Sequence, residues 1–144
     1  MMWLGSSDPT CAVTRRKHLR LVSAAFFASA LTGCGFAHDE RIDGPYRLVA
    51  IDADEEMSVC YDLAAHNCVG RVSQTVFAVG WNSNYIVAAR HPKSDRAKSE
   101  YFYIVRGLDG PYVDPTTCVR GPFQVAEFEV ERRRLSLPSL TKQF

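Results

Sequence analysis

The chain has 144 residues, and its 17 Lys and Arg residues nearly balance its 16 Asp and Glu residues. This balance excludes the basic electrostatic footprint that nucleic-acid binding requires. The hydrophobic share of 47% is enough for a real core, and the length suits a domain of ordinary size.

The first 34 residues carry the features of an export leader. Its basic residues are Arg15, Arg16, Lys17 and Arg20. The apolar run 21–31 that follows is too short to span a bilayer, which needs about 20 apolar residues. The run ends in Leu31, Thr32, Gly33 and Cys34. This order resembles a bacterial lipoprotein signal peptide that ends in a lipobox.

The resemblance implies that residues 1–33 are cleaved off and that Cys34 becomes the lipidated first residue of the mature protein. Two or more acyl chains anchor a protein stably, whereas one chain binds a membrane only marginally. Gly35 stands where the enteric pattern has Asp for inner-membrane retention, so the resemblance implies the periplasmic face of an outer membrane, in a source that has one. Segment 14–20 also resembles a twin-arginine signal, with His18 where Phe is usual, which leaves the export route open.

The expected mature chain has 13 basic and 15 acidic residues, because the leader removes four of the former and one of the latter. We expect residues 34–44 to be a polar tether and residues 45–144 to be one globular domain. Its cysteines are Cys60, Cys68 and Cys118. In an oxidising compartment they make at most one intramolecular disulfide. The short separation favours Cys60 with Cys68, and Cys118 is expected to be a small buried hydrophobe.

The domain is predicted to be α+β, with a mainly antiparallel sheet of about five strands and one C-terminal helix. The predicted strands are 45–51, 57–61, 68–72, 76–81, 85–90 and 101–106, the third of these pairing back on the second. Asn82, Ser83 and Asn84 supply turn chemistry for a hairpin, and the last three strands form a meander. Alternation predicts that Phe77, Val79 and Trp81 share one face.

The final segment changes to a helical period. Phe123, Ala126 and Val130 are spaced i, i+3 and i+7, and the strand alternation is broken there. Pro122 suits the first helical position, and the arginines at 132–134 suit the last turn. The sequence therefore predicts a helix over 122–134 that packs on the sheet.

Residues 44–137 also carry a series of short motifs. These are a Gly-Trp-Asn hairpin, a Tyr-Ile-Val strand, a Tyr-Phe-Tyr-Ile-Val strand, a Gly-Pro step and a Glu-Phe helix. Their order resembles small lipoproteins catalogued as a domain of unknown function. The resemblance supports the predicted fold and transfers no catalytic residues.

Metal and cofactor sites are not expected. Cys60 and Cys68 enclose seven residues, which does not fit the two to four of structural zinc sites, even with His66 between them. Segment 52–56 alternates acidic residues like the start of an EF-hand, but Met57 and Leu63 occupy the positions that need Gly and Glu.

No motif for a nucleophile, a phosphate loop or a dinucleotide is present, so we expect no enzyme. We expect a membrane-anchored envelope lipoprotein that binds a protein or another envelope component. The expected binding surface comprises Trp81 and Tyr85 together with the charged loop 91–99. Two alternatives remain: an inhibitor or immunity-type lipoprotein against an exported toxin or hydrolase, and a small envelope enzyme that uses His66 or His91.

The lipobox generates a direct prediction. In a bacterial host the protein should incorporate labelled palmitate and partition into detergent, because the Cys34 thiol is the atom that accepts the diacylglyceryl group. The substitution Cys34→Ala should abolish both properties. Equal labelling of the two proteins would contradict lipidation at this site.

Overall fold

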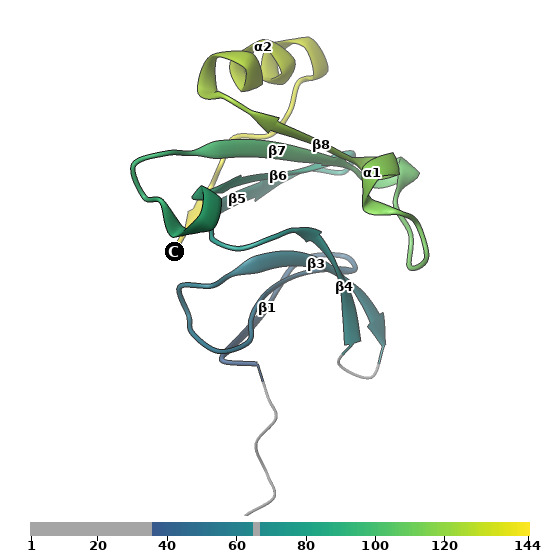
Figure 1. Ribbon diagram of the computed structural model, residues 1–144. Helices are drawn as coiled ribbons and strands as arrows, with labels where there is room; N and C mark the ends of the chain where they lie inside the picture. The colour runs from purple at the N-terminus through teal and green to yellow at the C-terminus, as the bar shows by residue number, and fades with distance from the viewer. Residues whose placement is uncertain (1–35, 65–66) are drawn as a thin grey trace, which may run out of the picture. The chain divides into compact units, whose positions relative to one another are not determined.

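Apolar strand residues build two antiparallel sheets that pack face to face. The computed structural model describes residues 36–64 and 67–144. The first sheet has the order β1-β2-β3-β4 and the second has the order β8-β7-β6-β5-β9 (Figure 1). The first comprises β1 (His38–Asp43), β2 (Tyr46–Ala50), β3 (Ser58–Ala64) and β4 (Asn67–Val72). The second comprises β5 (Val76–Trp81), β6 (Tyr85–Arg90), β7 (Glu100–Val105), β8 (Val119–Phe123) and β9 (Lys142–Gln143).

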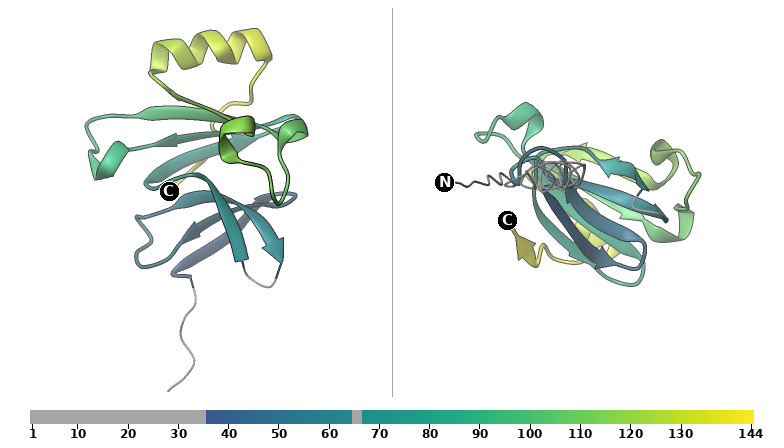
Figure 2. Two further views of the ribbon diagram at one scale, coloured as in Figure 1. Left: turned by 45° about the vertical axis from the view of Figure 1, so that its right-hand side comes forward. Right: turned by 90° about the horizontal axis from the view of Figure 1, so that it is seen from below.

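Four helical segments join or cover these strands. They are the 3-10 turns η1 (Pro92–Ser94) and η2 (Arg106–Leu108), the short helix α1 (Pro115–Cys118) and the longer helix α2 (Val125–Leu135). Figure 2 shows α2 lying along the outer face of the second sheet, on the side away from the first sheet. Among the helices of the described residues, none is long and apolar enough to cross a membrane.

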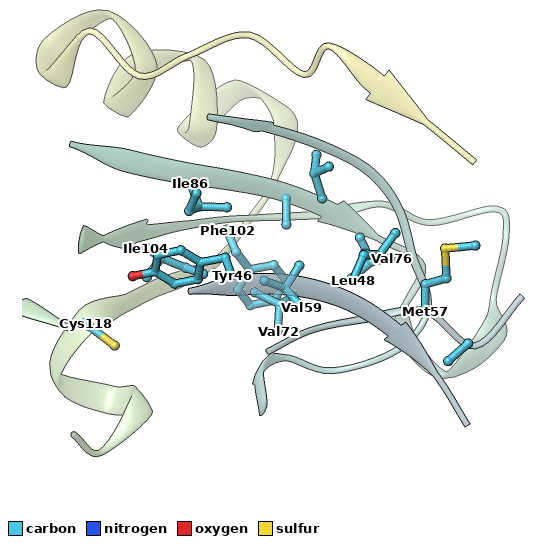
Figure 3. Packing of buried hydrophobic residues seen from close by; sticks show 13 residues of the cluster. Tyr46, Leu48, Met57, Val59, Val72, Val76, Ile86, Phe102, Ile104 and Cys118 are labelled. Atoms are coloured by element: carbon cyan, nitrogen blue, oxygen red, sulfur yellow. The ribbon is translucent and has the colours of Figure 1, made fainter. Parts of the chain in front are cut away.

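The main core lies between the two sheets (Figure 3). Its fully buried side chains include Tyr46, Leu48 and Val59 from the first sheet and Val79, Ile86 and Ile104 from the second. A smaller cluster lies on the other face of the second sheet, under α2. Its buried members are Val87, Tyr103, Phe128 and Leu137. Because the second sheet is apolar on both faces, it is the middle layer of the domain.

The predicted fold class is confirmed. The β5–β6 hairpin pairs Trp81 with Ile86, and β7 continues the meander by pairing Ile104 with Ile86. The predicted return of 68–72 on the preceding strand is also confirmed, because β4 pairs with β3. The nine described strands form two sheets rather than one, and they exceed the six predicted ranges because β1, β8 and β9 were not predicted.

Most of the expected tether is a strand. Residues His38–Asp43 form β1 at the edge of the first sheet, where His38 lies opposite Ala50. The segment is polar, so its strand structure depends on partners in neighbouring elements. Asp39 forms an ion pair with Arg47 on β2, and Asp43 forms one with Arg106 at 2.6 Å. The folded domain therefore begins before residue 45.

The predicted helix start at Pro122 is wrong. Residues 119–123 form the edge strand β8, and α2 begins at Val125. Gly121 has φ +125°, and a Cβ there would lie 2.6 Å from the carbonyl oxygen of Tyr101, so only glycine allows this approach of β8 to β7. The Gly121–Pro122 bond is cis.

The predicted apolar face of the helix is also wrong. Within α2 only Phe128 is buried, whereas Val125 and Val130 are each 58% exposed. The ring of Phe128 stacks on Tyr101 with centroids 5.1 Å apart. The arginine-rich end forms ion pairs at i,i+3, with Arg132 at 2.8 Å from Glu129.

A buried ion pair joins the two halves of the domain. Arg71 on β4 lies 2.8 Å from Asp109, which follows η2, and both side chains are fully excluded from solvent. Arg71 also donates to the carbonyl of Gly110 at 2.8 Å, and the Tyr46 hydroxyl donates to Asp109 at 2.9 Å. Burial and this hydrogen bond raise the pKa of Tyr46. The charges are therefore compensated inside the protein rather than by water.

Loss of one partner of this pair should be costly. We expect Asp109→Asn to lower the free energy of unfolding by about 3–5 kcal/mol, because the guanidinium of Arg71 stays buried without its counter-charge. The double variant Arg71→Met/Asp109→Leu should be more stable than Asp109→Asn, because it leaves no unpaired charge. Urea unfolding measures both. A negligible effect of Asp109→Asn would contradict the burial of the pair.

The packing of α2 gives a second stability prediction. Phe128→Ala should cost about 3–5 kcal/mol, because it removes a buried ring from the cluster beneath the helix. Val130→Ala is the matched control on the same helix and should stay within about 0.5 kcal/mol of the parent, since the side chain is exposed. The melting temperatures of the two variants provide the measurement. Equal shifts would show that α2 does not pack through Phe128.

Candidate functional site

A cleft of about 520 Å³ lies where loops of both sheets meet. Its lining comes from four segments that are far apart in sequence. They are Ala53 to Met57 between β2 and β3, Thr75 to Phe77 at the start of β5, His91 and Arg96 between β6 and β7, and Phe144 after β9. Figure 1 shows the C-terminus at the same end of the domain as these loops.

Backbone hydrogen bonds hold the lining segments in place. The amide of Val76 donates to the carbonyl of Met57 at 2.8 Å, which fixes the start of β5 against the acidic loop. The amide of His91 donates to the carbonyl of Thr75 at 2.9 Å, so the β5–β6 pairing extends beyond the strands. The inner part of the cleft is therefore built on sheet backbone, which gives it a defined shape.

A β-bulge aims Phe77 at this cleft. The register of β5 against β6 shifts between Val76 and Ala78, which leaves Phe77 as the extra residue. The ring of Phe77 stacks on the imidazole of His91, with centroids 4.3 Å apart and planes 21° apart. Val79 and Trp81 pack in the core between the sheets, whereas Phe77 lies outside that cluster, at the point where the bulge interrupts the predicted alternation.

The hydrogen bonds of Thr75 and His91 determine which of their side-chain atoms can still donate or accept a hydrogen bond. The hydroxyl of Thr75 donates to the carbonyl of His91 at 3.0 Å. The Nδ1 atom of His91 lies 2.7 Å from the carbonyl oxygen of Lys98. A carbonyl only accepts, so Nδ1 carries the hydrogen in this contact. In the neutral ring Nε2 then keeps its lone pair.

An ion pair connects the two loops at the mouth of the cleft. Arg96 lies 3.2 Å from Glu55, and the two side chains are 73% and 77% exposed. Such an exposed pair contributes little to stability and is screened by salt. The contact can therefore open at small cost.

The predicted disulfide is confirmed. Cys60 on β3 and Cys68 on β4 are bonded, with Cα atoms 5.7 Å apart. Cys118 is free and fully buried, as expected. Burial, with the charge of Asp109, raises the pKa of Cys118 to about 11, which keeps it a thiol at neutral pH. None of these cysteines lines the cleft.

Trp81 and Tyr85 do not form one surface. Trp81 packs on the core between the sheets, whereas Tyr85 packs on the cluster beneath α2, with its ring 6.1 Å from that of Tyr103. Both stand beside the Asn82–Asn84 turn, at the opposite end of the β5–β6 hairpin from His91. Of the expected binding surface, only loop 91–99 contributes to the cleft.

The lipobox residues and His66 lie outside the residues that the structure describes. Leu31, Thr32, Gly33 and Cys34 precede the described residues, and His66 lies in the gap at 65–66. Within residues 36–64 and 67–144, no group of three His, Cys, Asp or Glu side chains is placed to hold a metal ion.

No protein-family model, curated protein or solved structure matches this chain.

Proposed function

We propose that this protein is a lipid-anchored envelope lipoprotein that acts by binding, without turnover, and that the cleft is its binding site. The observation that carries the proposal is the cleft itself, a cavity of about 520 Å³ with aromatic walls and charged groups at its mouth. Ligand sites are typically concave, with apolar walls and a few placed polar groups. The expected partner is a protein or another component of the envelope.

The cleft lies close to the point where the folded domain would be joined to a lipid anchor. Phe144, which lines the cleft, has its ring 6.4 Å from that of His38, the first residue of β1. Cys34 precedes His38 by four residues, which span about 14 Å at most. A lipid on Cys34 would therefore keep this end of the domain close to a membrane surface, on the outer membrane if the leader follows the enteric pattern.

The hydrogen bonding in the cleft supports binding over nucleophilic catalysis. A hydroxyl nucleophile needs a base within hydrogen-bond reach. The hydroxyl of Thr75 instead donates to the backbone carbonyl of His91, and the imidazole is held by the carbonyl of Lys98. These contacts shape the walls of a binding site and leave no activated nucleophile at Thr75.

Site-specific photo-crosslinking in intact cells tests this proposal. A benzophenone amino acid replaces Phe144 at the cleft or, as the matched control, Tyr112, which is 95% exposed and does not line the cleft. We expect a discrete adduct from position 144, lost when Phe77→Ala is added, and none from position 112. Adducts only from position 112, or identical adducts from both, would place binding elsewhere and overturn the proposal.

A further inference from the structure

We infer that the cleft takes a planar cationic hydrogen-bond donor, and that its ligand carries a guanidinium group. This inference rests on the proposed function, since it names the ligand chemistry of the same site. It follows from the donors and acceptors in the lining, from the aromatic walls and from a guanidinium that the chain itself places at the mouth.

The inner polar groups of the cleft present lone pairs. The hydroxyl hydrogen of Thr75 is used in its bond to the His91 carbonyl, and the Nδ1 hydrogen of His91 is used in its bond to the Lys98 carbonyl. What remains to face a ligand is the oxygen of Thr75 and, in the neutral ring, Nε2 of His91. Both are acceptors, so a ligand at this wall has to supply donors.

The charges of the lining favour a cation. The acidic loop contributes the carboxylates of Asp54, Glu55 and Glu56, against the single guanidinium of Arg96. Arg96 is already paired with Glu55. Among the described residues, the side chains of Asp54 and Glu56 make no hydrogen bond or ion pair. A cationic ligand would therefore gain carboxylate partners without having to break an internal pair at these two positions.

The aromatic walls suit a flat cation. Phe77 stacks on His91, and Phe144, whose amide donates to the carbonyl of Phe77 at 3.0 Å, also lines the cleft. The ring of Phe144 already accepts a cation, because the ammonium of Lys142 lies 5.3 Å from its centroid. A guanidinium is planar, stacks on aromatic faces and carries five donors, whereas an ammonium is a compact, strongly hydrated charge. The Phe144 ring thus accepts an ammonium, and a guanidinium adds to such a contact the planar donors that the acceptors of the cleft can take.

The Glu55–Arg96 ion pair is the same kind of contact that we propose between a cleft carboxylate and the guanidinium of a ligand. It shows a guanidinium held by a cleft carboxylate at 3.2 Å. An incoming guanidinium competes with Arg96 for Glu55, so the two residues should have opposite effects on affinity. Removing Glu55 removes a ligand contact, whereas removing Arg96 removes a competitor and a repelling charge.

Calorimetric titration of the full-length protein in detergent micelles with N-acetyl-arginine amide tests the inference. We expect saturable binding that Glu55→Gln weakens severalfold, because the carboxylate of Glu55 is exposed and its contact with a guanidinium is screened by solvent. Arg96→Gln should tighten binding severalfold. Glu129→Gln and Arg133→Gln on α2 are the charge-matched controls and should bind like the parent. Thermal melts of every variant confirm that the fold is retained.

Four further probes separate the alternatives. N-acetyl-citrulline amide, the neutral planar isostere, should not bind, and the lysine amide should bind more weakly than the arginine amide. Agmatine binding as tightly as the arginine amide would support a free small guanidine, and tighter binding of the amide would support an arginine in a peptide. Equal binding of citrulline and arginine, or binding of N-acetylglycine that depends on Arg96, would overturn the inference. A cleft adduct in the crosslinking experiment without arginine binding would refute the ligand class and leave the binding site standing.

Discussion

The buried Arg71–Asp109 pair is the constraint on which the arrangement of the two sheets depends. A charge inside a protein is tolerated only where partners compensate it, and here the partners come from β2, β4 and the segment after η2. Apolar contacts survive a small shift of one sheet against the other. A buried ion pair does not, because the shift would separate the two charges inside the protein. The pair adds little net stability relative to apolar residues of the same size, but it penalises every packing in which Arg71 and Asp109 fail to meet.

Elements with a local signal could be predicted from the sequence, and elements without one could not. The β5–β6 hairpin has apolar strands and a turn within 15 residues, and the Cys60–Cys68 bridge closes a short loop between adjacent strands. In contrast, β1 is a charged segment that becomes a strand through pairs with Arg47 and Arg106. The predicted helix includes the last two residues of β8, because Pro122 suits both an edge strand and the first turn of a helix.

The residues of the candidate site were harder to predict than the fold, because their arrangement depends on contacts between segments that are far apart in the sequence. Loop 91–99 was expected to take part in binding because it is charged, and it does line the cleft through His91 and Arg96. The role of Phe77 depends on a bulge, and a bulge is a property of two strands in register rather than of one sequence segment. Trp81 and Tyr85 are close in sequence, but they lie on opposite faces of the sheet. Trp81 pairs with Ile86 across the hairpin and shares its face, whereas Tyr85, next to Ile86 in the strand, points to the other face.

The pairing of β9 with β5 has a kinetic consequence. Among the described strands, every other pair joins neighbours along the chain, and local hairpins form within microseconds. The β5–β9 contact, with Ala78 opposite Gln143, closes a loop of more than 60 residues and is therefore expected late in folding. Until it forms, β5 presents a row of unpaired backbone groups along an apolar strand. The chain thus passes through an interval in which a second copy can take the place of β9, and self-association competes with folding at this edge.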